Sequence, residues 1–161
     1  MDAAPARRAG HLEPRGVRIE VVGQEQVGVR VAVQRAAFER STFTEQRWDA
    51  MAAGPAYADA RCLVAYNDQD TAVAAATVWS AGPGRPGLLE PMGVHRNHRG
   101  HGFGTAMTVA AAAALRELGS SSATVCTPSA NVGAVATYEA AGFERLPDVR
   151  DLHRGARRGS H

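Results

Sequence analysis

The stretch from Leu88 to Leu118 constrains the fold of this 161-residue chain more than any other. A short apolar run at 88–94 leads into a basic, glycine-rich turn at 99–104, and a long alanine-rich helical pattern follows. Glycines in such a turn let the backbone approach a ligand, while successive N–H groups and the start of the helix attract negative charge. A strand, a glycine turn and a helix in this order therefore predict a phosphate-binding site.

The spacing of the glycines separates the protein classes that use this arrangement. A P-loop requires Gly-Lys followed by Ser or Thr, and the sequence contains no lysine. A dinucleotide-binding turn requires G-x-G-x-x-G early in a βαβ unit. The pattern here is Arg-x-x-Gly-x-Gly, formed by Arg99, Gly102 and Gly104. It resembles the acyl-CoA signature of the GNAT superfamily of N-acyltransferases.

A second motif strengthens this resemblance. Residues 131–143 read Asn-Val-Gly-Ala-Val-Ala-Thr-Tyr-Glu-Ala-Ala-Gly-Phe and look like the closing motif of the same superfamily. The two motifs stand about one helix and one strand apart, and the resemblance covers roughly residues 17–153. It implies an α/β (α+β) fold with a mixed, mainly antiparallel central sheet, splayed parallel strands four and five, and about four flanking helices.

Local patterns place the expected elements. Residues 24–40 alternate like a strand but also carry a helical stripe, and their length favours a helix. Thr42 to Glu45 form a plausible capping box for a helix that runs to about Ala53. Further helices are expected at 103–118 and 132–141, and strands at 17–22, 61–66, 71–79, 88–94, 123–126, 143–146 and 149–153.

Composition and charge exclude several classes of protein. A hydrophobic content of 45% fits one globular domain, expected at 17–153 between flexible tails at 1–16 and 154–161. Neither a membrane-spanning run nor a secretory signal is found, which favours a cytoplasmic protein. Residues 17–142 hold ten arginines and eleven acidic residues. This near-neutral balance has no basic stripe of the kind that binds nucleic acid, so a nucleic-acid partner is not expected. Cys62 and Cys126 lie in apolar runs and are expected to be buried, reduced thiols.

The resemblance implies that acetyl-CoA is the co-substrate and that no metal takes part. Its pantetheine arm would add like a strand to the backbone of Met92, Gly93 and Val94. Its pyrophosphate would meet the N–H groups of the glycine turn. The cofactor-binding residues expected after the strand are Arg99, Gly100, His101, Gly102, Phe103, Gly104, Thr105 and Asn131. Asn131 could equally be the N-cap of the last helix.

Two residues are candidates for proton transfer. Tyr138 matches the tyrosine that the family uses to protonate the departing thiolate, although an amphipathic helix could also simply pack such a side chain. Glu90 is the best-placed base for the amine, since alternation along an extended strand would put it on one face with Met92 and Val94. Alternatively, Glu90 could form a salt bridge to a neighbouring arginine.

The expected acceptor is a primary amine on a small molecule, attacked directly in a ternary complex. Phe38, Phe43, Trp48 and Tyr57 could line its pocket or could belong to the core, and Glu39, Asp49 or Glu90 could meet its charge. Three alternatives stay open: a catalytically silent acyl-CoA-binding module, one half of a tandem protein, and an acetyltransferase of protein N-termini or lysines. Assembly as a homodimer is also left open.

Overall fold

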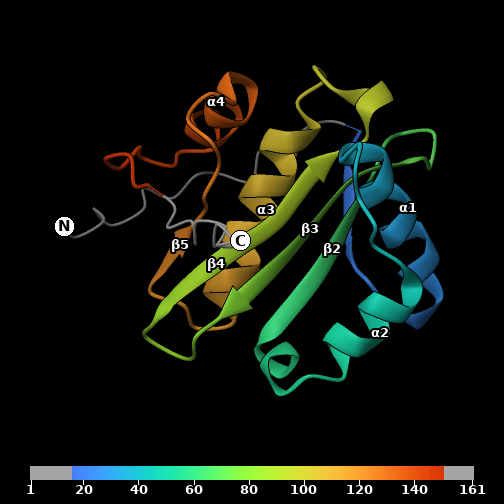
Figure 1. Ribbon diagram of the computed structural model, residues 1–161, viewed down its shortest axis with the longest axis horizontal. Coiled ribbons are helices and arrows are strands. Elements are labelled where there is room, and N and C mark those ends of the chain that lie inside the picture. The colour runs from blue at the N-terminus through green and yellow to red at the C-terminus, as the bar shows by residue number, and fades with distance from the viewer. Residues whose placement is uncertain (1–15, 151–161) are drawn as a thin grey trace, which may run out of the picture.

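The computed structural model describes residues 16–150, whose strands form one five-stranded sheet in the order β1-β2-β3-β4-β5 (Figure 1). All neighbouring strands are antiparallel except β4 and β5, which are parallel. The expected mixed, mainly antiparallel sheet is therefore confirmed. The strands are β1 Arg18–Val21, β2 Ala60–Tyr66, β3 Ala72–Ser80, β4 Pro86–Val94 and β5 Ser122–Thr124.

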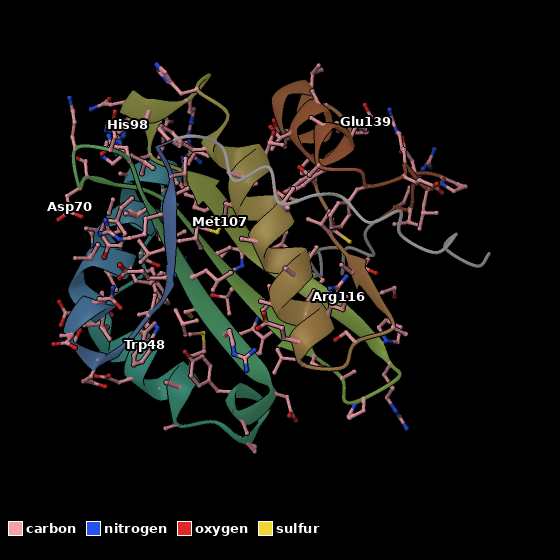
Figure 2. The ribbon with its side chains drawn as sticks, turned by 180° about the vertical axis from the view of Figure 1, so that it is seen from behind. Trp48, Asp70, His98, Met107, Arg116 and Glu139 are labelled. Carbon is pink, nitrogen blue, oxygen red and sulfur yellow. The ribbon has the colours of Figure 1, made fainter. Side chains whose placement is uncertain are left out.

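Helices cover both faces of this sheet. The α1–α2 pair packs on one face and α3 on the other, while α4 lies beside α3 (Figures 1 and 2). The ambiguous segment at 24–40 is helical, as its length predicted. The helices are α1 Val27–Ala37, α2 Glu45–Ala52, α3 Phe103–Glu117 and α4 Val132–Ala140, with 3₁₀ turns η1 Gln24–Gln26, η2 Pro55–Asp59 and η3 Arg96–His98.

The sheet separates two apolar cores. On the α3 side, Met107, Ala111 and Leu115 are buried against β3 and β4, and Figure 2 labels Met107 beside α3. This helical face is the one that the sequence pattern predicted. On the other side, Trp48 of α2 and Val31 of α1 pack on β2.

One charged side chain is buried in the α1–α2 layer. Arg30 is 1% exposed, and its Nη2 donates to Thr77 Oγ1 at 3.1 Å while its Nη1 donates to Gln34 Oε1 at 2.6 Å. No ion pair of Arg30 occurs within residues 16–150. Desolvation lowers the pKa of this guanidinium.

The start of α2 differs from the expected capping box at 42–45. Thr44 is the N-cap, because its backbone is extended and its Oγ1 accepts from the N–H of Arg47 at 3.2 Å. The Thr42 hydroxyl instead accepts from the Arg47 guanidinium at 2.6 Å. The helix begins where predicted, but the capping residue was wrong.

The end of the sheet is shorter than expected. The structure has no strand at 143–146 or at 149–150, and residues 151–153 lie outside the described part. Leu146 is 65% exposed and Val149 87% exposed, so neither has the burial that would hold such a strand in place. The expected tails at 1–16 and 154–161 also lie outside the described residues, except Gly16.

The two cysteines have different environments. Cys62 is fully buried, and its Sγ lies 3.1 Å from Thr77 Oγ1. Cys126 is exposed, which corrects the expectation that both thiols are buried. Both are free thiols. Within residues 16–150, no helix has the length and apolar character needed to cross a bilayer, and no cluster of three metal-ligating side chains occurs.

Candidate active site

The parallel strands β4 and β5 form a fork. They pair only from Pro86 with Ser122 to Leu88 with Thr124. Beyond Leu88, β4 continues to Val94 beside β3, while the chain leaves β5 as irregular backbone (Figure 1). The splay expected between the fourth and fifth strands is therefore present.

The open side of β4 carries unpaired backbone groups. The N–H of His95 donates to Val73 O at 2.8 Å and so points toward β3. Alternate residues of an antiparallel strand direct their N–H groups to opposite sides. Gly93 therefore also faces β3, whereas Met92 and Val94 direct their N–H and C=O groups into the fork.

A bulge in β4 changes the side-chain faces. Ala76 pairs with Met92 but Val78 pairs with Leu89, so Thr77 faces two residues, Glu90 and Pro91. Pro91 has no N–H to donate to the ladder, and such a position favours a bulge.

Because of this bulge, the expectation that Glu90 shares one face of the strand with Met92 and Val94 is wrong. A Cβ at Gly87 would touch Leu115 of α3, and Leu89, Met92 and Val94 all pack in the α3 core. By alternation, Glu90 lies on the opposite face, where its side chain is exposed. Glu90 thus lies on the side of α1 and α2, across the sheet from Met92.

The glycine turn joins β4 to α3 through η3. Gly100 and Gly102 have φ of 78° and 82°, and a Cβ at either position would point into open space. These two glycines are thus required by backbone conformation, and no other part of the described chain covers them. Gly104 has another role, since its Cβ would lie 3.0 Å from Thr137 of α4 and 3.3 Å from Val94.

Two arginines of this region bind the end of α1. Arg99 Nη2 donates to Ala37 O at 2.7 Å, and Arg96 Nε donates to Ala36 O at 3.0 Å. Cations at a helix C-terminus satisfy free carbonyls and interact favourably with the helix dipole. Arg99 therefore ties the turn to α1 in this structure, a contact that the motif alone did not reveal.

Aromatic rings cover the start of α3. His101 is exposed and stacks on Phe103 with ring centroids 6.1 Å apart, and its Nδ1 lies 3.2 Å from His98 O. Phe103 also contacts the α3 core, and Thr105 follows in the first helical turn. The residues predicted around this turn thus lie together at one end of β4.

Tyr138 reaches the same region from α4. It is 8% exposed and belongs to the cluster that Met92 and Val94 contact. Burial raises the pKa of its phenol above the usual value of 10.0. Its hydroxyl has no hydrogen-bond partner among residues 16–150. Asn131 instead caps α4, because its Oδ1 accepts from the N–H of Ala134 at 3.2 Å.

Of the aromatic residues expected to line an acceptor pocket, Trp48 and Phe43 belong to the α1–α2 core instead. Trp48 is 6% exposed in the α1–α2 core, and its ring meets the edge of Tyr57 at 5.9 Å. Phe43 packs against the same core. Phe38 packs beside Gly93.

Sequence reasoning missed Trp79. Its ring centroid lies 6.2 Å from that of Tyr57, and its Nε1 donates to Glu90 O at 2.8 Å. The available signal was its place at the end of the strand expected at 71–79, directly before a segment rich in Gly and Pro.

Comparisons with known proteins agree with this geometry. Residues 30–143 match the model of the acetyltransferase (GNAT) family. A search of curated proteins found no significant match.

Solved structures share the fold at low sequence identity. An aminoglycoside 6'-N-acetyltransferase, AAC(6')-Ih from Acinetobacter baumannii, is 16% identical with a TM-score of 0.68, covering 88% of this chain and 99% of its own. AAC(6')-Iy in complex with a CoA bisubstrate analogue is 13% identical with a TM-score of 0.70, covering 87% and 99%. A putative acetyltransferase from Agrobacterium tumefaciens is 16% identical with a TM-score of 0.69, covering 85% and 99%.

Proposed function

Because the chain belongs to the acetyltransferase (GNAT) family, we propose that it transfers the acetyl group of acetyl-CoA to a primary amine of a small molecule. The observation that carries this proposal is the fork between β4 and β5, which leaves the backbone of Met92 and Val94 unpaired. An unpaired strand edge inside a sheet is a binding site for an extended ligand with amide groups.

The residues present fit acetyl-CoA along the whole of this edge. Met92 and Val94 offer backbone donors and acceptors for the pantetheine amides. The N–H groups around Gly100 to Thr105, at the start of α3, suit a pyrophosphate, with open space above Gly100 and Gly102. Asn131 and Arg99 would act through the backbone, since their side chains cap α4 and α1.

Acetyl-CoA supplies an activated acyl group as a thioester, and the chain's own residues manage the protons. Glu90 takes a proton from the acceptor ammonium, directly or through water, so that the amine nitrogen can attack the thioester carbonyl carbon. A backbone N–H of the fork donates to the carbonyl oxygen as negative charge develops there. Tyr138 protonates the sulfur as the carbon–sulfur bond breaks. The acylated nitrogen passes its second proton through water to the Tyr138 phenolate, which restores the phenol and leaves a neutral amide and the free thiol. Glu90 then releases its proton to solvent, which completes direct transfer in a ternary complex.

A survey of amines, read by release of free thiol, tests the proposed reaction. The panel contains alkylamines, arylalkylamines, polyamines, amino acids, an aminoglycoside, and peptides with a free N-terminus or a lysine. We expect at least one small amine to release thiol and to yield its N-acetyl product by mass spectrometry. Acetylation of the peptides alone would make the protein a peptide or protein acetyltransferase. Binding of acetyl-CoA without any product would make it a silent acyl-CoA-binding module.

A further inference from the structure

A hollow lies at the root of the fork. Its volume is about 280 Å³, and Trp79, Leu88 and Thr124 contribute to its lining together with Ser80, the last residue of β3, and Pro86, the first residue of β4. Leu88 and Thr124 are the last residues at which β4 and β5 still pair. The hollow therefore lies over the paired part of the two strands and ends where they separate, on the same strand as Met92 and Val94 of the proposed site.

The hollow opens on the sheet face that bears Glu90. Trp79 pairs with Leu88, and Leu88 pairs with Thr124, so the three residues form one row across three strands. Paired residues direct their side chains to the same face of a sheet. Gly87 and Leu89 face α3, so this row faces the other way, and Glu90 follows Leu88 on that same face.

The lining of the hollow is uncharged and mostly apolar, with the hydroxyls of Ser80 and Thr124 as its polar side-chain groups, and its indole is held in place. The indole N–H of Trp79 donates to Glu90 O at 2.8 Å, and the ring edge meets Tyr57, so one orientation of the indole is fixed. Leu88 supplies an aliphatic wall beside the indole. None of the residues that line the hollow is charged. A polycation would therefore meet no carboxylate in the lining itself.

On the basis of the proposed acetyl transfer, we propose that the acceptor is a monoamine with a compact aromatic or aliphatic body. The body occupies the hollow against Trp79 and Leu88, and the amine reaches up the strand toward Glu90 and the fork. Burial of apolar surface against a fixed indole provides the affinity, and one carboxylate matches one ammonium. Aminoglycosides, with several ammonium groups and a polar body, do not match this lining.

The test compares kcat/KM for 2-phenylethylamine, ethanolamine and a polycationic aminoglycoside. We expect the wild type to prefer 2-phenylethylamine over both by about 10-fold or more, as expected for an apolar contact in a pocket. Leu88→Ala should lower kcat/KM for 2-phenylethylamine by about 10-fold or more and leave the Kd of acetyl-CoA unchanged. Leu146→Ala is the matched control, because Leu146 is exposed and lies outside the hollow.

A second variant keeps the test valid if Leu88→Ala is unstable. Thr124→Arg changes an exposed residue of the edge strand β5 and places a cation in the hollow. It should reduce kcat/KM for 2-phenylethylamine by about 10-fold or more with an unchanged circular dichroism spectrum.

Three results would overturn the assignment of the acceptor. A wild type that prefers the aminoglycoside, or a Leu88→Ala or Thr124→Arg variant with the wild-type preference, would contradict the hollow as acceptor site while acetyl transfer stands. If no amine is acetylated although acetyl-CoA binds, the proposed reaction itself fails, and the acceptor class fails with it.

Discussion

Tyr138 has the environment that a proton donor needs. Burial in the α3 core raises its pKa, so the phenol stays protonated from neutral to mildly alkaline pH. We expect Tyr138→Phe to lower kcat by about 10²–10⁴-fold, because it removes one positioned proton donor. Acetyl-CoA affinity should change little. Tyr66→Phe, in the other core, is the matched control. Equal kcat in Tyr138→Phe and wild type, with chemistry rate-limiting, would give Tyr138 a packing role only.

Glu90 is exposed on the face of the proposed acceptor hollow. If it removes the proton from the amine, Glu90→Gln should lower kcat by about 10²–10⁴-fold while the variant still binds acetyl-CoA. The exchange is close in size and occurs at an exposed position, so thermal stability should be preserved. Glu25→Gln, in the 3₁₀ turn before α1, controls for the loss of one negative charge. If Glu90→Gln turns over as fast as the wild type, water rather than Glu90 removes the proton from the amine.

His95 lies at the start of the turn after β4, and its surroundings lower its pKa. Its Nδ1 accepts the N–H of Asn97 at 3.1 Å, and burial, followed by His98 and Arg96, lowers its pKa below 6.5. The pKa of His95 is lower in the folded chain than in the unfolded chain. Between these two pKa values the unfolded chain therefore binds more protons than the folded chain. The free energy of unfolding should rise with pH across this range and level off above a pH of about 6.5. NMR titration of the ring should give a midpoint below 6.5; a midpoint above that value would refute the lowered pKa.

At the scale of elements, the close contact between α1 and β4 depends on one glycine. A Cβ at Gly93 would lie 2.7 Å from the Cβ of Ala37 and 2.9 Å from the Phe38 ring. Gly93→Ala should therefore lower the free energy of unfolding by about 1–3 kcal/mol, the usual cost of overpacking. Urea denaturation measures this change. A loss below about 0.5 kcal/mol would mean that α1 moves away from β4 without resistance.

Elements with strong local signals were predictable from the sequence. The glycine turn and the apolar stripe of α3 set the position of that helix, and Gly119 follows its end with φ of 84°. The mixed, mainly antiparallel sheet and the splay of β4 and β5 came from the family resemblance, since strand pairing joins residues far apart in the chain.

Features that depend on pairing or on distant contacts were not predictable in the same way. The bulge that moves Glu90 to the other face arises where Pro91 interrupts the ladder; the proline was a visible signal, but its register effect was not. The strands expected at 143–146 and 149–153 had suitable residues but no observed partner within the described chain. The contacts of Arg96 and Arg99 with α1 join residues about 60 positions apart, which no local pattern reports.

At the scale of the whole molecule, the sheet divides the proposed reaction between its two faces. Tyr138 and the start of α3 lie on one side of the fork, whereas Glu90 and the hollow lie on the other. The fork is the opening through which the two sides meet. Under the proposed function, the phosphorylated co-substrate would bind at the C-terminal end of β4, and the apolar body of the amine would bind at the start of the same strand.

Binding of acetyl-CoA to a variant of the glycine turn tests this account most directly. Isothermal titration calorimetry should detect binding by the wild type and none by Gly102→Val, because a β-branched residue resists φ of 82° and its side chain enters the space above the turn. Gly84→Val is the matched control: Gly84 also has a positive φ, of 73°, and open space, but it lies in the loop between β3 and β4. It should bind acetyl-CoA like the wild type. Undiminished affinity in a folded Gly102→Val protein would contradict the assignment of this turn and fork as the acyl-CoA site.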